Sequence, residues 1–150
     1  MCDINDIDEY KFTGIIKFDY RASGIADSDI KNNTVQCFIE VLNKIKTKIE
    51  IIGRYTSDFN IKLDFSENYL TDKSIAELYY FLKENILLSK HLISLNISNN
   101  HLTENSFGYI EKIYEEFYCV KINISSNNIS LKKFRERFGI ESKIVKFMVQ

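Results

Sequence analysis

The sequence predicts an α/β fold built from repeated strand–helix units. Two observations lead to this prediction. A short motif of alternating apolar residues that ends in asparagine recurs along the chain. Between its copies, apolar residues recur every three or four positions, which is the spacing of one face of a helix. A strand, a turn and a helix in succession bring consecutive strands side by side in parallel.

The clearest copy of the motif runs from Leu92 to Leu102 and fills every fixed place of the pattern L-x-x-L-x-L-x-x-N-x-L. Leu95 and Ile97 alternate with polar residues, which predicts a strand with one face on the core and one toward solvent. Asn100 follows that strand. Its side chain can bond backbone groups that the end of the strand leaves unpaired.

Three further stretches repeat the pattern less completely. The asparagines at 68, 100 and 127 are spaced by 32 and 27 residues, whereas 45 residues separate Ser23, at the same place in the first copy, from Asn68. We therefore expect structural turns at Asn68, Asn100 and Asn127, and an insertion in the first unit. The fixed apolar places are Cys119, Ile122, Ile124 and Ile129 in the last copy, Leu63, Phe65 and Leu70 beside a polar Asn60 in the second, and Ile15, Phe18, Tyr20 and Ile25 in the first.

The pattern is the signature of a leucine-rich repeat. The stretch from Asn68 to Leu82, which reads Asn-x-Leu-Thr-Asp-x-x-Ile-x-x-Leu-x-x-x-Leu, resembles the ribonuclease-inhibitor-like class of these repeats. This resemblance covers roughly residues 13 to 130. It implies a short solenoid, a right-handed βα superhelix with a parallel sheet on its concave side and helices on its convex side. We expect one domain over residues 1–150 with about four repeats, strands near 15–20, 61–65, 93–97 and 120–124, and a C-terminal cap strand over 144–149.

Helices are predicted between these strands. The first predicted helix begins near Lys31. For residues 48–59 two interpretations compete: we favour the helix continuing to Gly53, and the alternative is a strand from Ile49 to Arg54. Thr71 or Ser74 can cap the second helix, and Ser74 with Glu77 has capping-box spacing. The apolar stripes are Val35, Phe38, Leu42, Ile45, Ile49 and Ile52; then Ile75, Leu78, Phe81 and Leu82; then, after a Thr103 cap, Phe107, Ile110, Ile113, Tyr114 and Phe117; a last helix, Leu131 to Phe138, starts after Ser130 and stops at Gly139.

Composition excludes several classes of function. A net charge of −1 gives no reason to expect nucleic acid or an anionic membrane as partner, and no stretch approaches the length of a membrane span. The acidic start lacks the features of a secretory signal, so we expect a cytoplasmic protein, or one delivered into a host cell by a route that needs no signal peptide. No motif indicates a cofactor or a metal: Cys2, Cys37 and Cys119 are scattered, and we expect the latter two to be small core residues.

The resemblance implies a non-catalytic scaffold that binds another protein through its concave face or its caps. The alternatives are a GTPase regulator, by analogy with Ran GTPase-activating proteins of the same repeat class, and a small enzyme with a doubly wound sheet. The partner's identity and the oligomeric state stay open. The side chains expected on the concave face are Lys17, Asp19, Arg21, Lys62, Asp64, Ser66, Ser94, Asn96, Ser98, Lys121, Asn123 and Ser125, followed by Lys146 and Met148.

Two other surfaces are candidates, and one stability test follows. The tyrosines at 79, 80, 109, 114 and 118 lie on predicted helices and could form a convex patch. The C-terminal end is basic, and could dock an acidic partner. Because Asn96 and Asn123 are expected to face solvent, we expect Asn96→Lys and Asn123→Lys to leave the thermal midpoint almost unchanged. The basic residues are Lys132, Lys133, Arg135, Arg137, Lys143 and Lys146, opposed by Glu136 and Glu141.

Overall fold

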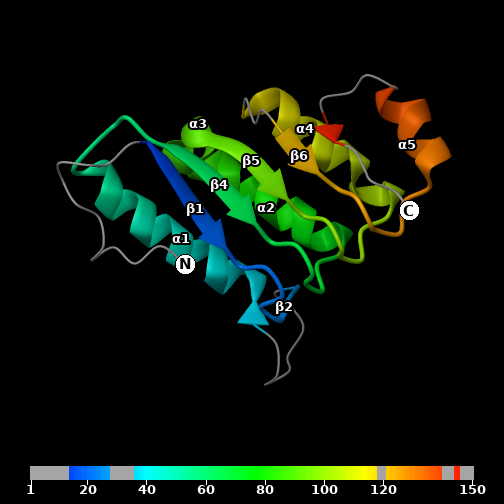
Figure 1. Ribbon diagram of the computed structural model, residues 1–150, viewed down its shortest axis with the longest axis horizontal. Helices are drawn as coiled ribbons and strands as arrows, with labels where there is room; N and C mark the ends of the chain where they lie inside the picture. The colour runs from blue at the N-terminus through cyan, green and yellow to red at the C-terminus, as the bar shows by residue number, and fades with distance from the viewer. Residues whose placement is uncertain (1–13, 28–35, 118–120, 140–143, 146–150) are drawn as a thin grey trace.

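Five parallel strands form the main sheet of the computed structural model, which describes residues 14–27, 36–117, 121–139 and 144–145 (Figure 1). The spatial order of the strands is their order along the chain, β1-β4-β5-β6-β7. A doubly wound sheet reverses its strand order and carries helices on both faces. The doubly wound alternative is therefore wrong for the described residues. The strands are β1 (Ile15–Asp19), β4 (Asn60–Asp64), β5 (Leu92–Asn96), β6 (Lys121–Asn123) and β7 (Ile144–Val145).

Among the described residues, the helices lie along one face of this sheet and none of them covers the other face (Figure 1). The described members of the three predicted stripes are buried along α1, α2 and α4, except that Tyr114 and Phe117 are half-buried. Val35, in the first stripe, lies outside the described residues. The helical elements are α1 (Phe38–Gly53), α2 (Asp72–Glu84), α3 (Ile86–His91), the short turn η2 (Glu104–Ser106) that leads into α4 (Phe107–Glu116), and α5 (Leu131–Phe138).

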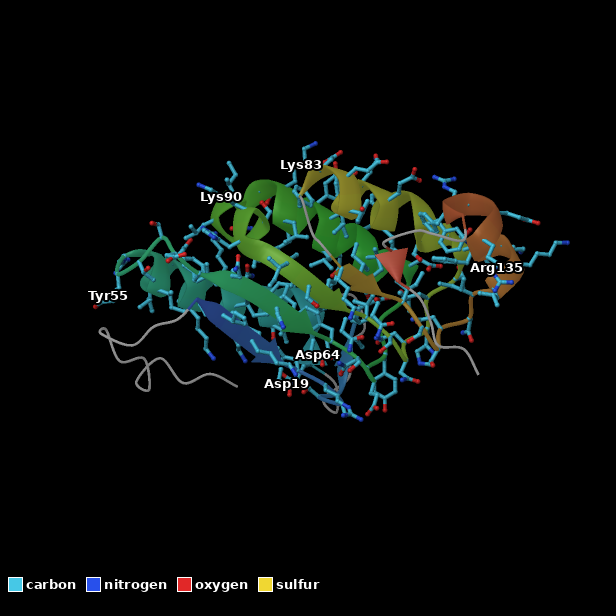
Figure 2. The ribbon with its side chains drawn as sticks, turned by 45° about the horizontal axis from the view of Figure 1, so that its top comes forward. Asp19, Tyr55, Asp64, Lys83, Lys90 and Arg135 are labelled. Atoms are coloured by element: carbon cyan, nitrogen blue, oxygen red, sulfur yellow. The ribbon has the colours of Figure 1, made fainter. Side chains whose placement is uncertain are left out.

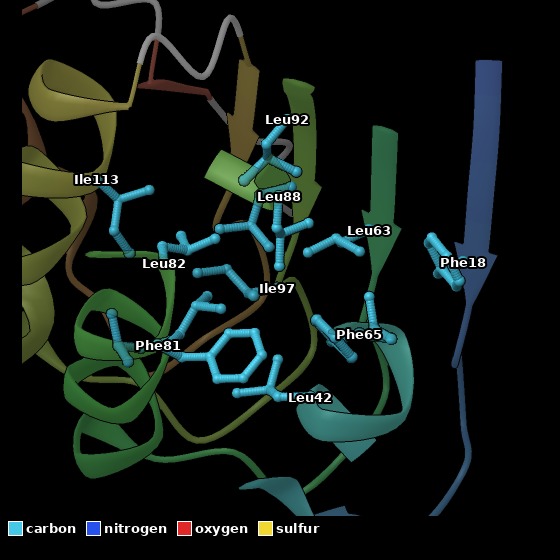
Figure 3. Close-up of a cluster of buried hydrophobic side chains, with 14 of the residues drawn as sticks. Phe18, Leu42, Leu63, Phe65, Phe81, Leu82, Leu88, Leu92, Ile97 and Ile113 are labelled. Atoms are coloured by element: carbon cyan, nitrogen blue, oxygen red, sulfur yellow. The ribbon is translucent and has the colours of Figure 1, made fainter. Parts of the chain in front are cut away.

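The core lies between the sheet and the helices. Figure 3 shows side chains of the strands, such as Leu63, meeting side chains of the helices, such as Leu42 and Leu82. All three are at most 1% exposed. Burying one such side chain contributes about 1.5–3 kcal/mol, so the apolar places of the motif are the main stabilising contacts of each unit.

The insertion of the first unit contains a second, two-stranded sheet. Strand β2 (Ile25–Ala26) pairs in parallel with β3 (Gln36–Cys37). The predicted helix start near Lys31 lies outside the described residues, and a helix that continues through residues 36 and 37 is wrong because they form this strand. Cys37 is half-buried there, so its predicted place in a helical core is wrong as well.

Helix α1 accounts for the rest of the insertion. It spans 16 residues to Gly53 and buries Ile45, Ile49 and Ile52 on one face. The predicted long helix is therefore confirmed to that residue, and the strand alternative is wrong. Phe59, rather than the polar Asn60, fills the apolar place before β4: Phe59 is 3% exposed and stacks on His91.

The helix starts follow the predicted caps with one exception. Thr71 caps α2, and the Oγ of Ser74 accepts the backbone N–H of Thr71 at 3.0 Å. The predicted box from Ser74 to Glu77 is wrong because Ser74 is itself inside the helix and buried. Thr103 and Ser130 accept backbone N–H groups at the starts of η2 and α5, as predicted.

The C-terminal unit agrees with the sequence as far as it is described. Helix α5 has its predicted bounds and ends at Gly139, whose φ of 79° lies in the left-handed region that glycine tolerates. Strand β7 is the described part of the predicted cap strand over 144–149. Lys146 and Met148 lie outside the described residues. The short helix α3 was not predicted from the sequence.

Candidate functional site

The uncovered face of the sheet, here called the sheet face, brings the predicted concave side chains together. Strand register places Lys17 beside Lys62, and Asp19 beside Asp64. The next strands continue both rows. From β1 to β6 the first row is Lys17, Lys62, Ser94 and Lys121, and the second is Asp19, Asp64, Asn96 and Asn123.

Most of the predicted residues reach solvent. Lys17, Asp19, Arg21 and Lys121 are exposed, while Lys62, Asp64, Ser94, Asn96, Asn123 and Ser125 are half-buried. Ser66 and Ser98 are 4% and 6% exposed, so the expectation that they face solvent is wrong. Their hydroxyls donate to the carboxylate of Asp64 and to the amide oxygen of Asn96, at 2.6 and 2.7 Å.

The second row also has a structural role, which the sequence pattern did not predict. In each of the four strands, the Oδ1 atom of the Asp or Asn accepts the backbone N–H of the residue two positions later. This bond caps the end of the strand in a turn typical of Asp and Asn. The four pairs are Asp19 with Arg21 (3.1 Å), Asp64 with Ser66 (3.0 Å), Asn96 with Ser98 (3.1 Å) and Asn123 with Ser125 (3.0 Å).

One residue beyond each of these turns has a left-handed backbone. A positive φ at a residue other than glycine is uncommon, so its recurrence at the same place in four units shows that the units share one local geometry. The four residues are Ala22 (φ 51°), Glu67 (57°), Asn99 (52°) and Ser126 (54°).

Asn100, where the sequence predicts a structural turn, forms hydrogen bonds through both atoms of its side-chain amide. Asn100 is 6% exposed, and its Oδ1 accepts the backbone N–H of Leu70 at 2.9 Å. Its Nδ2 donates to the carbonyl oxygens of Phe65, Ile97 and Ser98 at 3.0–3.1 Å. Leu70 and Phe65 belong to the preceding unit. The side chain therefore ties one unit to the next.

Asn68 and Asn127 repeat this arrangement, so all three predicted asparagines join neighbouring units. Asn68 Oδ1 accepts the N–H groups of Ser23 and Ile25, and Asn127 Oδ1 accepts those of Asn100 and Leu102. In the first unit Ser23 stands where the others have asparagine, and its own backbone is the group that Asn68 binds.

Carboxylates form a second set of ties near the helix starts. The oxygens of Asp27 accept the hydroxyls of Thr71 and Ser74, and those of Asp72 accept the N–H and hydroxyl of Thr103. For the ties made by Asp72 and Glu104, the sequence signal is a threonine followed directly by an acidic residue, at positions 71–72 and 103–104. The third tie joins Glu104 to the Ser130 N–H at 3.1 Å.

The charges of the sheet face are only partly compensated. Lys17 Nζ lies 4.0 Å from Asp19 Oδ2 and 3.9 Å from Asp64 Oδ2, which relieves the repulsion between these two neighbouring carboxylates. Arg21 donates to Glu67 at 2.8 Å, and this bond raises the pKa of the Arg21 guanidinium. Among the described residues, the Lys62 ammonium has no such partner.

The tyrosines of the helices mostly contact one another. Tyr79 is 4% exposed, lies 5.1 Å from Tyr80 and 5.7 Å from Tyr109 between ring centres, and donates its hydroxyl to Glu116 at 2.8 Å. That bond raises the pKa of Tyr79. Lys112 lies over the rings of Tyr79 and Tyr109. The cluster thus has partners of its own, and Tyr118 lies outside the described residues.

The basic C-terminal end is partly neutralised. Arg137 donates to Glu111 at 2.6 and 2.9 Å, and Lys133 lies 3.9 Å from Glu104. A hollow of about 240 Å³ lies between α1 and the start of α3, with Ile86 at its rim 72% exposed. Neither the basic end nor the hollow recurs in the other units, whereas the two rows of the sheet face extend across four strands.

Two classes of site are not found in the described part of the chain. No three His, Cys, Asp or Glu side chains within it are grouped so that they could hold a metal ion. None of the helices described is both long enough and apolar enough to cross a membrane.

Comparison with known families gives one match. Residues 91–113 match the model of the Leucine Rich Repeat family, and this range spans β5, the Asn100 turn and most of α4. Neither the curated proteins nor the solved structures contain a significant match to the chain. The chain therefore contains a leucine-rich repeat, a motif that generally mediates protein–protein interaction.

Proposed function

We propose that the chain is a single-domain solenoid of about four leucine-rich repeats, of the ribonuclease-inhibitor-like class, and a non-catalytic module that binds a partner protein through its sheet face. Two observations support the four repeats. The family match covers one unit, and the Asp or Asn turn followed by a left-handed residue recurs in all four.

The uncovered sheet is the observation that carries the binding function. Helices bury one face of the sheet, while the strand register places two rows of polar and charged side chains on the other. Figure 2 labels two members of one row, Asp19 and Asp64. Strands about 4.8 Å apart hold these side chains at fixed spacing. A rigid surface loses little conformational entropy on binding, which favours recognition of a partner.

No observation favours the two alternatives over this proposal. The analogy with Ran GTPase-activating proteins is drawn from the repeat class alone, and a shared fold does not imply a shared function. A small enzyme with a doubly wound sheet does not fit the strand order.

The test is affinity capture from a lysate of the source cell with two matched variants. Lys62→Glu with Ser94→Glu changes neighbouring positions of the sheet face, where neither side chain makes a hydrogen bond or ion pair with the described residues. Lys90→Glu with Asn43→Glu makes the same charge change on exposed residues of α3 and α1. Lys90 is labelled in Figure 2.

The proposal predicts a protein partner that the wild type and the helix variant retain and the sheet variant loses. Loss with the helix variant alone would assign binding to the convex side and reject the proposal. Both variants must first show the thermal midpoint of the wild type, so that a lost partner reports on the surface and not on unfolding.

A further inference from the structure

We propose that the β5–β6 half of the sheet face binds acidic side chains of the partner protein, because its amide groups are fixed to donate hydrogen bonds outward. This inference rests on the proposed binding function and names the chemistry of the partner. The groups concerned are the Nδ2 atoms of Asn96 and Asn123, with Lys62 and Lys121 in the row beside them.

The orientation of both amides follows from the turns at the strand ends. A backbone N–H can only donate, so the side-chain atom that it meets must be the oxygen and not the nitrogen. Ser98 N–H meets the Oδ1 of Asn96 at 3.1 Å, and Ser125 N–H meets that of Asn123 at 3.0 Å. The Nδ2 groups must therefore point away from the turns, and the amides cannot flip without breaking these bonds.

Asn96 has no acceptor capacity left for a partner. Its Oδ1 also accepts the hydroxyl of Ser98 at 2.7 Å, so both lone pairs of this oxygen are used. Its remaining function is donation through Nδ2. Asn96 thus selects for a partner that offers acceptors.

Both Nδ2 groups are open to solvent. Neither makes a hydrogen bond with the described residues, and no buried side-chain nitrogen or oxygen there lacks a partner. It follows that these nitrogens are not buried. They lie on adjacent strands, about 4.8 Å apart, and form a pair of donors with fixed direction.

The charges beside the pair favour carboxylates over neutral acceptors. Lys62 and Lys121 lie in the first row, and the acids of the second row, Asp19 and Asp64, belong to the β1–β4 half, where Lys17 lies within 4.0 Å of both. On β5 and β6 the two rows therefore hold the Lys121 ammonium and two amide donors but no carboxylate. Lys62, on the neighbouring strand β4, adds a second ammonium, and Lys17 offsets the charge of Asp64 on that strand. Hydrogen bonds to a charged acceptor are roughly twice as strong as neutral ones, so Asp and Glu side chains fit best.

Aspartate already occupies the equivalent place on β4, so an Asn→Asp substitution should test the role of the amide donors without unfolding the protein. Asp64 makes the same turn as Asn96, with Ser66 N–H on its Oδ1 at 3.0 Å. Asn96→Asp with Asn123→Asp should therefore keep the turns while it replaces each outward donor by an acceptor with negative charge. Asn43→Asp with Asn128→Asp makes the same charge change at exposed residues outside the sheet face.

The experiment is a fluorescence-anisotropy titration with a rhodamine-labelled octaglutamate peptide, with octalysine and an oligothymidylate of equal length as further probes. We expect the wild type to bind octaglutamate in preference to both. The Kd for octaglutamate should rise at least about tenfold in the Asn96→Asp, Asn123→Asp variant and stay within about twofold in the control variant. Asp64→Asn, which adds a third donor to the row, should lower the Kd.

Three results would overturn the inference: no octaglutamate binding by the wild type, equal weakening in both double variants, or tighter binding of either other probe. The proposed function fails separately. A partner that is captured by the wild type and lost with Lys62→Glu and Ser94→Glu would keep the sheet face as the binding surface even if octaglutamate is not bound.

Discussion

Asn100 gives the sharpest test of how the units are joined. Replacing it by alanine removes one acceptor and one two-proton donor from a buried site. Three carbonyl oxygens lose a bond, yet each keeps another partner. Phe65 O retains Asn68 Nδ2, Ile97 O retains Asn127 Nδ2, and Ser98 O retains Glu67 N–H.

The N–H of Leu70 is the group that the substitution leaves unpaired. Its bond to Asn100 Oδ1 is 2.9 Å long, and Leu70 is 0% exposed, so water does not readily replace the lost oxygen. An unsatisfied buried donor costs about 1–3 kcal/mol. With the lost packing of the side chain, we expect Asn100→Ala to lower the free energy of unfolding by about 2–3 kcal/mol and the thermal midpoint by roughly 5–10 °C.

Urea denaturation followed by circular dichroism measures this free energy. The control is Asn128→Ala at an exposed position, which we expect to change it by less than about 0.5 kcal/mol. A change for Asn100→Ala as small as that of the control would refute the view that this side chain ties the units together.

Three other predictions concern the core, a turn and pH. Leu95→Ala, at a core position 1% exposed, should cost about 3 kcal/mol in urea denaturation, and a cost below about 1 kcal/mol would contradict its place in the core. Ala22→Gly should stabilise the fold by about 0.5–1 kcal/mol, because glycine adopts the left-handed φ of 51° without strain; a lower thermal midpoint would contradict this. Hydrogen bonds from its own backbone N–H and from that of Ser130 lower the pKa of Glu104. The ionised Glu104 side chain therefore contributes its full stabilisation above the usual glutamate pKa of about 4.3, and this stabilisation is lost as the pH falls through the lowered pKa. An NMR titration that gives Glu104 an ordinary or raised pKa would contradict this assignment.

The repeating part of the fold could be predicted from the sequence because its signals are local. An alternating strand such as the one around Leu95, and the stripe Ile75, Leu78, Leu82, each appear within a short window. The predicted bounds of the main-sheet strands agree with the observed ones to within about two residues where the strands are described, which is the usual precision for element boundaries. The β2–β3 pair could not be found because each strand has two residues and their pairing is not local.

The sheet face was predicted in part, for a related reason. Alternation along each strand shows which side chains share a face, and the register confirmed both rows. It does not show whether a polar side chain is already bonded to its own backbone. That is why the expected neutrality of Asn96→Lys and Asn123→Lys is revised: lysine cannot accept the N–H of Ser98 or Ser125, so we now expect a loss of stability.

The side-chain amide signals in a ¹⁵N–¹H NMR spectrum would show directly whether the sheet face binds the partner protein. The ¹⁵N-labelled chain would be titrated with the protein that affinity capture recovers. We expect the Nδ2 signals of Asn96 and Asn123 to shift, while those of Asn68 and Asn100, which donate to buried carbonyl groups, stay in place. Shifts confined to the helical side, with the Asn96 and Asn123 signals unchanged, would contradict the sheet face as the binding surface.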